Sequence, residues 1–170
     1  MQRVLVIGGN GCGKTTLAVQ LAQKLGLPLT HLDRLYWQDN WQPVPNAVFD
    51  ARLEEVLATP RWVLDGNILR TLPRRLACAD TVVYMHFSSL RCMAGALKRQ
   101  LQWYGRSRPD MGVFCPERLD MAFLKSVWCF NKKNGPRIAA ALAAAPGVRV
   151  VELKNRRQAR AFLEKLPSHQ

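Results

Sequence analysis

Short apolar runs and helical repeats alternate along this chain. The runs are rich in β-branched residues, which is typical of buried strands. They fall at residues 3–7, 29–32, 61–65, 81–87 and 148–153. Between most of them, apolar residues recur every three or four positions, as on one face of a helix. This order of elements predicts an α/β fold, with a parallel sheet and helices on both of its faces.

The helical repeats also give approximate bounds. We expect helices over residues 14–25, 46–58, 90–104, 117–131, 138–145 and 158–166. Gly26 and Pro28 end the first of them, because glycine favours a helix C-terminus and proline cannot continue a helix. The pair Gly135 and Pro136 predicts a break before the helix at 138–145, since a proline removes a helical hydrogen bond.

The turn between the first strand and the first helix has the pattern G-x-x-x-x-G-K-T. Gly8, Gly13, Lys14 and Thr15 occupy its fixed positions. Glycines let the backbone wrap closely around phosphate oxygens, and a helix N-terminus favours anions. In such a loop the lysine reaches the β- and γ-phosphates and the hydroxyl binds Mg²⁺. The pattern predicts a P-loop that binds a nucleoside triphosphate.

Two acidic residues follow predicted strands. Asp33 comes after the second strand and Asp65 ends the third. Ligands of open α/β sheets bind at the carboxyl ends of the strands. Asp65 is therefore a candidate for holding Mg²⁺, and Asp33 for Mg²⁺ or a substrate hydroxyl. Asn67 and Arg70 follow closely, and arginines in this position can hold phosphoryl oxygens.

Two further segments lack periodicity. The first, within an acceptor-side segment at 33–60, includes Tyr36 and Trp37, which would either stack on a substrate ring or pack the loop onto the protein. The second, at 105–118, contains prolines, glycines and the arginines Arg106 and Arg108, and it lies between helices. In a nucleotide enzyme this is typical of a mobile lid.

Composition narrows the class of protein. The 170 residues suit a single domain over 1–170. The net charge of +13 indicates anionic partners, such as nucleotides, nucleic acid or an acidic membrane surface. Five cysteines without a C-x-x-C pair argue against disulfides and structural zinc, and favour a cytoplasmic protein. Neither a signal peptide nor a membrane-spanning segment is expected.

The chain contains GGNGCGKT, HLDRLYW, WVLDGN with trailing arginines, and RSRPDMG with CPER. Together these motifs resemble a family of P-loop kinases related to adenylate kinase, often labelled DNA topology modulation proteins. The resemblance covers nearly the whole chain. It implies a P-loop NTPase fold of the nucleoside monophosphate kinase type, with five parallel strands in the order 2-3-1-4-5 and an arginine-bearing lid. It also implies ATP and Mg²⁺ as cofactors.

By the same resemblance, Asp33 and Asp65 lie at the reaction centre, and Asn155 and Arg156 fall where relatives contact the adenine. The phosphate-binding residues would be Gly8, Gly9, Asn10, Gly11, Cys12, Gly13, Lys14, Thr15 and Thr16. Adenylate kinases carry D-G-F-P-R where this chain has Asp65-Gly66-Asn67-Ile68-Leu69-Arg70. They also carry an arginine near the positions of Gly95 and Ala96, whereas here Lys98 and Arg99 come a turn later.

The leading hypothesis is a phosphotransferase that moves the γ-phosphoryl group of ATP to a small acceptor. Lys14 and Mg²⁺, bound by Thr15 and Asp65, would hold the phosphates. Asp33 would orient or deprotonate the acceptor. Arg106 and Arg108 would close over the phosphates, with Lys132, Lys133 or Arg137 as further candidates. Residues expected to bind the acceptor are Asp33, Tyr36, Trp37, Asn67 and Arg70. The acceptor is a nucleotide, a nucleoside or a hydroxylated metabolite.

The alternative is a nucleotide-regulated DNA-binding protein, which the family label and the basic charge favour. Against it, the sequence has no helix-turn-helix or zinc-finger pattern, and its basic residues are dispersed. A GTPase is disfavoured because Asn131-Lys132-Lys133-Asn134 lacks the aspartate of a guanine-reading motif.

Overall fold

The strand that leads into the P-loop, β1 (Arg3–Gly8), lies at the centre of a five-stranded parallel sheet. The structure is a computed structural model that describes residues 1–111 and 113–167, so Gly112 of the predicted lid lies outside the described residues. The other strands are β2 (Leu29–His31), β5 (Trp62–Asp65), β6 (Thr81–Met85) and β7 (Arg149–Leu153). Their order, β2-β5-β1-β6-β7, confirms the predicted 2-3-1-4-5 arrangement.

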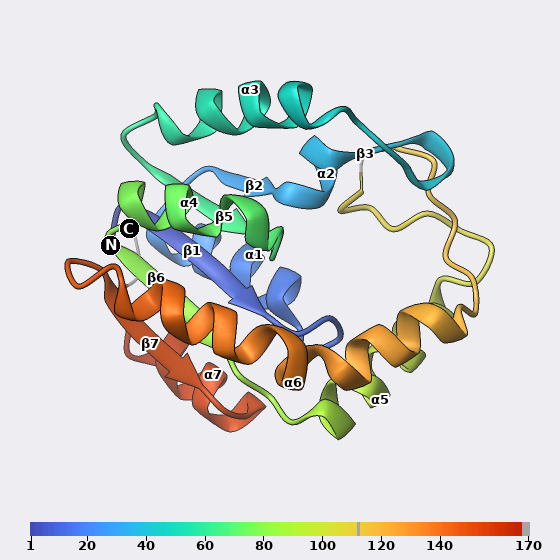
Figure 1. Ribbon diagram of the computed structural model, residues 1–170. Helices are drawn as coiled ribbons and strands as arrows, with labels where there is room; N and C mark the ends of the chain where they lie inside the picture. Colours follow the sequence, from blue (N-terminus) through green and yellow to red (C-terminus); the bar gives the residue numbers. More distant parts are fainter. Residues whose placement is uncertain (112, 168–170) are drawn as a thin grey trace.

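Successive residues of β1 point into two separate cores because side chains alternate across a strand. Val4 and Val6 pack with α1 (Lys14–Leu25), α5 (Ser89–Gln102) and α7 (Arg156–Glu164). Leu5 and Ile7 pack with α3 (Asn46–Leu57) and α4 (Leu72–Cys78). Helices thus cover both faces of the sheet, as Figure 1 shows. No helix in the described ranges is long and apolar enough to span a bilayer.

Helix α6 (Met121–Ala143) corrects one expectation from the sequence. The helices predicted on either side of Gly135 and Pro136 form a single helix with Pro136 inside it. Phe130 and Ile138, which lie before and after the proline, are both buried in the same core. Packing on both sides therefore outweighs the one backbone hydrogen bond that the proline removes.

The segment from residue 32 to 43 is more regular than predicted. It contains the short helix α2 (Leu32–Tyr36) and a hairpin of β3 (Trp37–Gln38) and β4 (Gln42–Pro43). The 3₁₀ turn η1 (Asp39–Trp41) connects the two strands of the hairpin. Strands this short cannot be predicted from the sequence, because two residues are too few to show an alternation of apolar and polar side chains.

A buried arginine holds the turn that follows β5. Arg75 is fully buried on α4, and its guanidinium donates hydrogen bonds to the carbonyls of Gly66 (3.0 Å), Asn67 (2.5 Å) and Ile68 (3.1 Å). Burial lowers the pKa of Arg75 to about 10, so the side chain is still a cation at neutral pH. The turn leads to η2 (Leu69–Thr71), and Arg75 fixes its path beside Asp65.

Replacing Arg75 with methionine should therefore destabilise the protein. The variant Arg75→Met leaves three backbone carbonyls without their donor, and we expect the free energy of unfolding in urea to fall by about 3 kcal/mol. Arg74→Met on the same helix is the matched control. It breaks a half-exposed ion pair with Glu54 and should cost about 0.5 kcal/mol. Equal losses for the two variants would contradict the role given to Arg75.

Candidate active site

The P-loop packs directly against α5 through two glycines. Gly11 has a φ of 83°, and a Cβ added to it would lie 2.0 Å from the carbonyl oxygen of Cys92. A Cβ on Gly95 would in turn lie 2.1 Å from the carbonyl oxygen of Gly11. No side chain fits at either position, so this contact fixes α5 against the loop. Arg99, one helical turn beyond Gly95, is thereby held beside the P-loop.

A hydrogen bond joins the start of α1 to the end of β5. The Thr15 hydroxyl Oγ1 donates to Asp65 Oδ2 at 3.0 Å, and Nδ1 of His31 lies 3.0 Å from the same oxygen. The other carboxylate oxygen, Asp65 Oδ1, is buried and has no hydrogen-bond partner in the described part of the chain. Lys14 Nζ donates a hydrogen bond to the Gly9 carbonyl of the same loop at 3.1 Å.

These oxygens fit the Mg²⁺ that the fold implies. A magnesium ion prefers hard oxygen ligands and is usually held by one or two protein groups together with substrate phosphates. Thr15 Oγ1 and the unpartnered Asp65 Oδ1 offer such oxygens next to the P-loop. Within residues 1–111 and 113–167, no cluster of three or more His, Cys, Asp or Glu side chains could hold a metal alone. A site that is completed by phosphates agrees with that.

Asp33 reaches the same region from α2. Burial raises the pKa of its carboxyl above the ordinary value, and the charge of Asp65 adds to this, while Arg108 and Lys14 act in the opposite direction. A carboxylate with a raised pKa is a better proton acceptor near neutral pH than an ordinary aspartate. Asp33 can therefore orient a hydroxyl group or take its proton.

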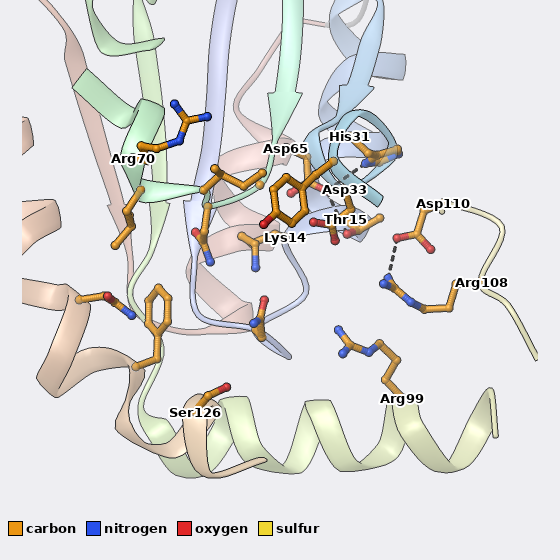
Figure 2. A pocket seen from close by; sticks show the side chains of 18 of the residues that line it. Lys14, Thr15, His31, Asp33, Asp65, Arg70, Arg99, Arg108, Asp110 and Ser126 are labelled. Atoms are coloured by element: carbon orange, nitrogen blue, oxygen red, sulfur yellow. Dashed lines mark hydrogen bonds and ion pairs between the residues drawn. The ribbon is translucent and has the colours of Figure 1, made fainter. Parts of the chain in front are cut away.

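Two arginines enter the site side by side, from α5 and from the lid (Figure 2). Figure 2 shows Arg99 rising from α5 and Arg108 coming from the lid, with both guanidinium groups toward the cavity. Arg108 Nη1 lies 2.6 Å from Asp110 Oδ2, and Arg108 Nε lies 2.9 Å from Oε1 of the buried Glu117. Arg99 Nε lies 3.1 Å from that same oxygen. Glu117 thus holds both arginines side by side.

Two hollows meet at this cluster. The larger, the acceptor cavity, has a volume of about 640 Å³ and extends from Asp33 and Asp65 to α6. The smaller, the donor hollow, has a volume of about 350 Å³ and is lined by the P-loop, α5, the lid and Arg156. Residues that line both are Lys14, Thr15, Arg99, Arg108 and Asp110. Ligands in the two hollows would meet at a shared set of cationic groups.

About half of the residues predicted for the site line the acceptor cavity. Its lining includes Asn10, Lys14, Thr15, Asp33, Tyr36, Asp65, Asn67, Arg70 and Arg108. The amide of Asn67 is engaged with the loop itself, since it accepts from the Gly8 amide at 3.0 Å and donates to the Gly8 carbonyl at 2.6 Å. Arg70 donates to both carboxylate oxygens of Asp50, at 2.7 and 3.0 Å. Their side chains are thus already partnered.

Other predicted residues lie elsewhere. Arg106 is exposed and lines neither hollow, so only Arg108 of the two lid arginines faces the site. Trp37 lines a neighbouring cavity with Trp41. Arg156 lines the donor hollow, as do Gly11, Gly13, Lys14, Thr15 and Thr16, whereas the Asn155 side chain caps α7 by accepting from the Gln158 amide.

The sequence prediction did not include several residues of the site. His31, Arg99, Asp110, Ser126 and Asn134 all line the acceptor cavity. Arg137 lines it too, and the sequence hypothesis named it only as a further candidate for the phosphates. The sequence did point to Arg99. Adenylate kinases carry an arginine in this helix near the positions of Gly95 and Ala96, and Arg99 comes one turn later. His31 precedes Asp33 by two residues at the same strand end. Ser126 and Asn134 had no sequence signal, because only the long helix α6 brings them to the cavity.

The lid is docked on the acceptor-side segment. Arg34, the neighbour of Asp33, donates to the carbonyls of Pro109 (2.8 Å) and Asp110 (2.9 Å). The amide of Asn40 donates to the Phe114 carbonyl at 2.7 Å, and Trp41 Nε1 donates to the Pro116 carbonyl at 3.0 Å. Figure 1 shows the lid segment beside the β3–β4 hairpin. The position of Arg108 therefore depends on contacts with the segment that carries Asp33.

Known proteins that are similar to the chain include shikimate kinases. Shikimate kinase 2 of Sodalis glossinidius (strain morsitans) is 32% identical over 120 residues, a match that covers 61% of this chain and 64% of that protein. The match thus spans less than two thirds of the relative's length. No protein-family model matches the chain.

Solved structures of shikimate kinases share the fold. The enzyme from Acinetobacter baumannii in complex with shikimate has a TM-score of 0.62 at 17% identity, over 97% of this chain and 90% of that one. The enzyme from Bacteroides thetaiotaomicron has a TM-score of 0.59 at 17% identity, over 96% and 95% of the two chains. The predicted fold class is confirmed: the chain has the α/β P-loop NTPase fold seen in shikimate kinases.

The docking contacts predict how the lid responds to loss of Arg34. Arg34→Ala removes both hydrogen bonds to residues 109 and 110, so we expect lid amides to exchange with deuterium about tenfold faster. Arg52→Ala is the matched control, because Arg52 binds the Leu35 carbonyl on the same segment and has no hydrogen bond to the lid. Unchanged exchange over the lid in Arg34→Ala would contradict this role.

Proposed function

We propose that the protein is an ATP- and Mg²⁺-dependent phosphotransferase that moves the γ-phosphoryl group to a hydroxyl of a small anionic acceptor. The observation that carries this proposal is the meeting of two hollows at one group of residues, Lys14, Thr15, Arg99 and Arg108. Phosphoryl transfer requires donor and acceptor to approach from opposite sides of the γ-phosphorus, with positive charge around it.

On the donor side, the P-loop amides and Lys14 would bind the β- and γ-phosphates. The nucleoside would extend along the donor hollow toward Arg156. Thr15 and Asp65 would hold Mg²⁺, which neutralises phosphate charge when bound. Arg99 and Arg108 face the shared region from α5 and the lid, where they would contact the equatorial oxygens of the transferred group.

On the acceptor side, Asp33 would accept the hydrogen bond of the reacting hydroxyl. The acceptor oxygen forms a bond to the γ-phosphorus, and the bond from that phosphorus to the β–γ bridging oxygen breaks. The products are a phosphomonoester and ADP. The hydroxyl proton passes to Asp33, whose raised pKa makes it a suitable acceptor.

An anionic, hydroxylated acceptor agrees with the far end of the acceptor cavity. Arg137 and Asn134 project there from α6, and Arg137 has no ion pair with any residue in the described ranges. A cationic side chain without a partner can bind a carboxylate or phosphate. Shikimate, a hydroxylated carboxylate, is bound in the Acinetobacter baumannii structure and is the first compound to test here.

Nucleic acid is a less favoured partner. The net charge of +13 supports anion binding in general, and no observation at the site favours DNA over a nucleotide. The proposed alternative of a nucleotide-regulated DNA-binding protein would require affinity that persists at physiological salt.

Loss of Lys14 should abolish phosphoryl transfer. A screen of ADP release from MgATP with hydroxylated acids, nucleosides and nucleotides would identify an acceptor, and Lys14→Ala should then lower kcat at least about a thousandfold. Lys24→Ala, in the last turn of the same helix, is the matched control and should keep full activity. Undiminished transfer by folded Lys14→Ala would exclude the proposed site.

Titration of Asp33 should determine how kcat/KM falls at low pH. Because Asp33 must be ionised to accept a proton, kcat/KM should fall as the pH decreases through its raised pKa, at higher pH than for an ordinary aspartate. Asp33→Asn should lower kcat about a hundredfold or more and remove this acid limb of the pH profile.

A stability measurement controls for misfolding of this variant. Burial disfavours the ionised carboxyl, so Asp33→Asn should not lower the free energy of unfolding above the raised pKa. An acid limb that persists unchanged in Asp33→Asn would assign the titration to another group.

A further inference from the structure

A second cavity opens beside the acceptor cavity. This side chamber has a volume of about 240 Å³ and lies between the β3–β4 hairpin, the lid, α5 and the start of α6. It shares Asn10, Asp33, Arg99 and Arg108 with the acceptor cavity, so the two adjoin at the proposed reacting hydroxyl. A molecule held at Asp33 can therefore extend into either space.

Aromatic side chains form much of the chamber wall. Trp37 and Trp41 meet edge to face, with ring centroids 5.6 Å apart, and Phe123 of α6 lines the chamber as well. The guanidinium carbon of Arg99 lies 5.2 Å from the centre of the Phe123 ring. Rigid aromatic walls of this kind suit the faces of a ring better than a flexible chain.

One buried polar atom on the chamber wall has no partner. Gln100 on α5 is only 2% exposed, and its Oε1 atom makes no hydrogen bond in the described part of the chain. Leaving a buried acceptor without a donor is unfavourable, and such atoms in folded proteins call for a partner. Gln100 Oε1 is itself shielded from the chamber, so a ligand that donates a hydrogen bond would supply the partner when the amide turns its oxygen toward the chamber.

Charges around the chamber cancel. The lining contains three acidic and three basic side chains, which are Asp33, Glu117 and Asp120, and Arg99, Arg108 and Arg118. Glu117 is engaged with two of these arginines, and Asp120 caps α6 by accepting from the Phe123 amide. The balance gives no preference for an anion or a cation, in contrast to the arginine end of the acceptor cavity.

We propose that the side chamber is a second acceptor subsite, which takes an uncharged ring that donates a hydrogen bond to Gln100 Oε1. The inference rests on the proposed function, because the ring would be part of the acceptor whose hydroxyl lies at Asp33. At about 30 Å³ for each water molecule, the chamber has room for one small ring.

Docking of the lid encloses this subsite. The Trp41 indole donates to the Pro116 carbonyl, and Cys115 Sγ lies 3.2 Å from the Gln38 carbonyl oxygen, so the hairpin and the lid close the chamber together. Arg108 is part of the same wall. An occupant of the chamber would therefore favour the docked lid and, with it, the position of Arg108 at the phosphates.

A pair of small ring probes tests the subsite without turnover. The probes 4-fluorophenol and 4-fluorotoluene have nearly the same shape, and only the phenol donates a hydrogen bond. Ligand-observed fluorine NMR should show that the wild-type protein binds the phenol about fivefold more tightly. In Gln100→Leu this preference should disappear, while binding of the toluene remains.

Further variants keep the test decisive. Gln100→Met also removes the acceptor oxygen and should behave in the same way if Gln100→Leu does not fold. Trp37→Leu should weaken both probes. Lys14→Ala should bind the phenol like the wild type, because Lys14 does not line the chamber. Ring binding is thus measured independently of phosphoryl transfer, and either proposal can fail without the other. Equal binding of the two probes, no binding of either, or a preference that survives in both Gln100 variants would overturn the subsite.

Discussion

The hydrogen bond from Thr15 to Asp65 is the interaction on which the rest of the site depends. It joins the first turn of α1 to the end of β5, and His31 at the end of β2 meets the same carboxylate oxygen. Parallel strands bring these three residues together, because their carboxyl ends lie at one edge of the sheet. The remaining Asp65 oxygen is buried and has no hydrogen-bond partner among the described residues, and it is the oxygen that we propose for Mg²⁺.

The contact between Gly11 and Gly95 gives the site its second wall. Because neither position has room for a Cβ, α5 lies directly on the P-loop. The helix therefore places Arg99 at the acceptor cavity and Gln100 at the side chamber. Docking of the lid adds Arg108, and Arg34 connects that lid to the segment that carries Asp33. The P-loop contacts α5, and the lid contacts the segment that carries Asp33, each through a few short contacts.

The sequence was sufficient for the parts of the molecule that follow local rules. The P-loop pattern and the strand that ends at Asp65 were predicted because they depend on residues close together in the chain. The order of the sheet was predicted from the family resemblance, and Asp33 lies in α2, two residues beyond the end of β2. The aromatic segment was left between two interpretations, and the structure places Trp37 and Trp41 at a cavity wall.

Features that depend on distant contacts were not predictable. Arg106 and Arg108 are two residues apart and equally basic, and only the docking of the lid decides that Arg108 faces the site. The continuity of α6 through Pro136 depends on burial of Phe130 and Ile138 against other elements. Arg137 and Asn134 reach the acceptor cavity only because α6 continues. Local propensity cannot reveal such tertiary effects.

The chemical form of the transferred phosphorus tests the central claim most directly. Phosphorus-31 NMR of the protein with MgATP and a panel of hydroxylated acids that includes shikimate would follow the γ-phosphate to its product. The account predicts a new phosphomonoester resonance that grows together with an equal amount of ADP. A γ-phosphorus that appears only as inorganic phosphate, or only in the anhydride of a nucleoside diphosphate, would contradict it.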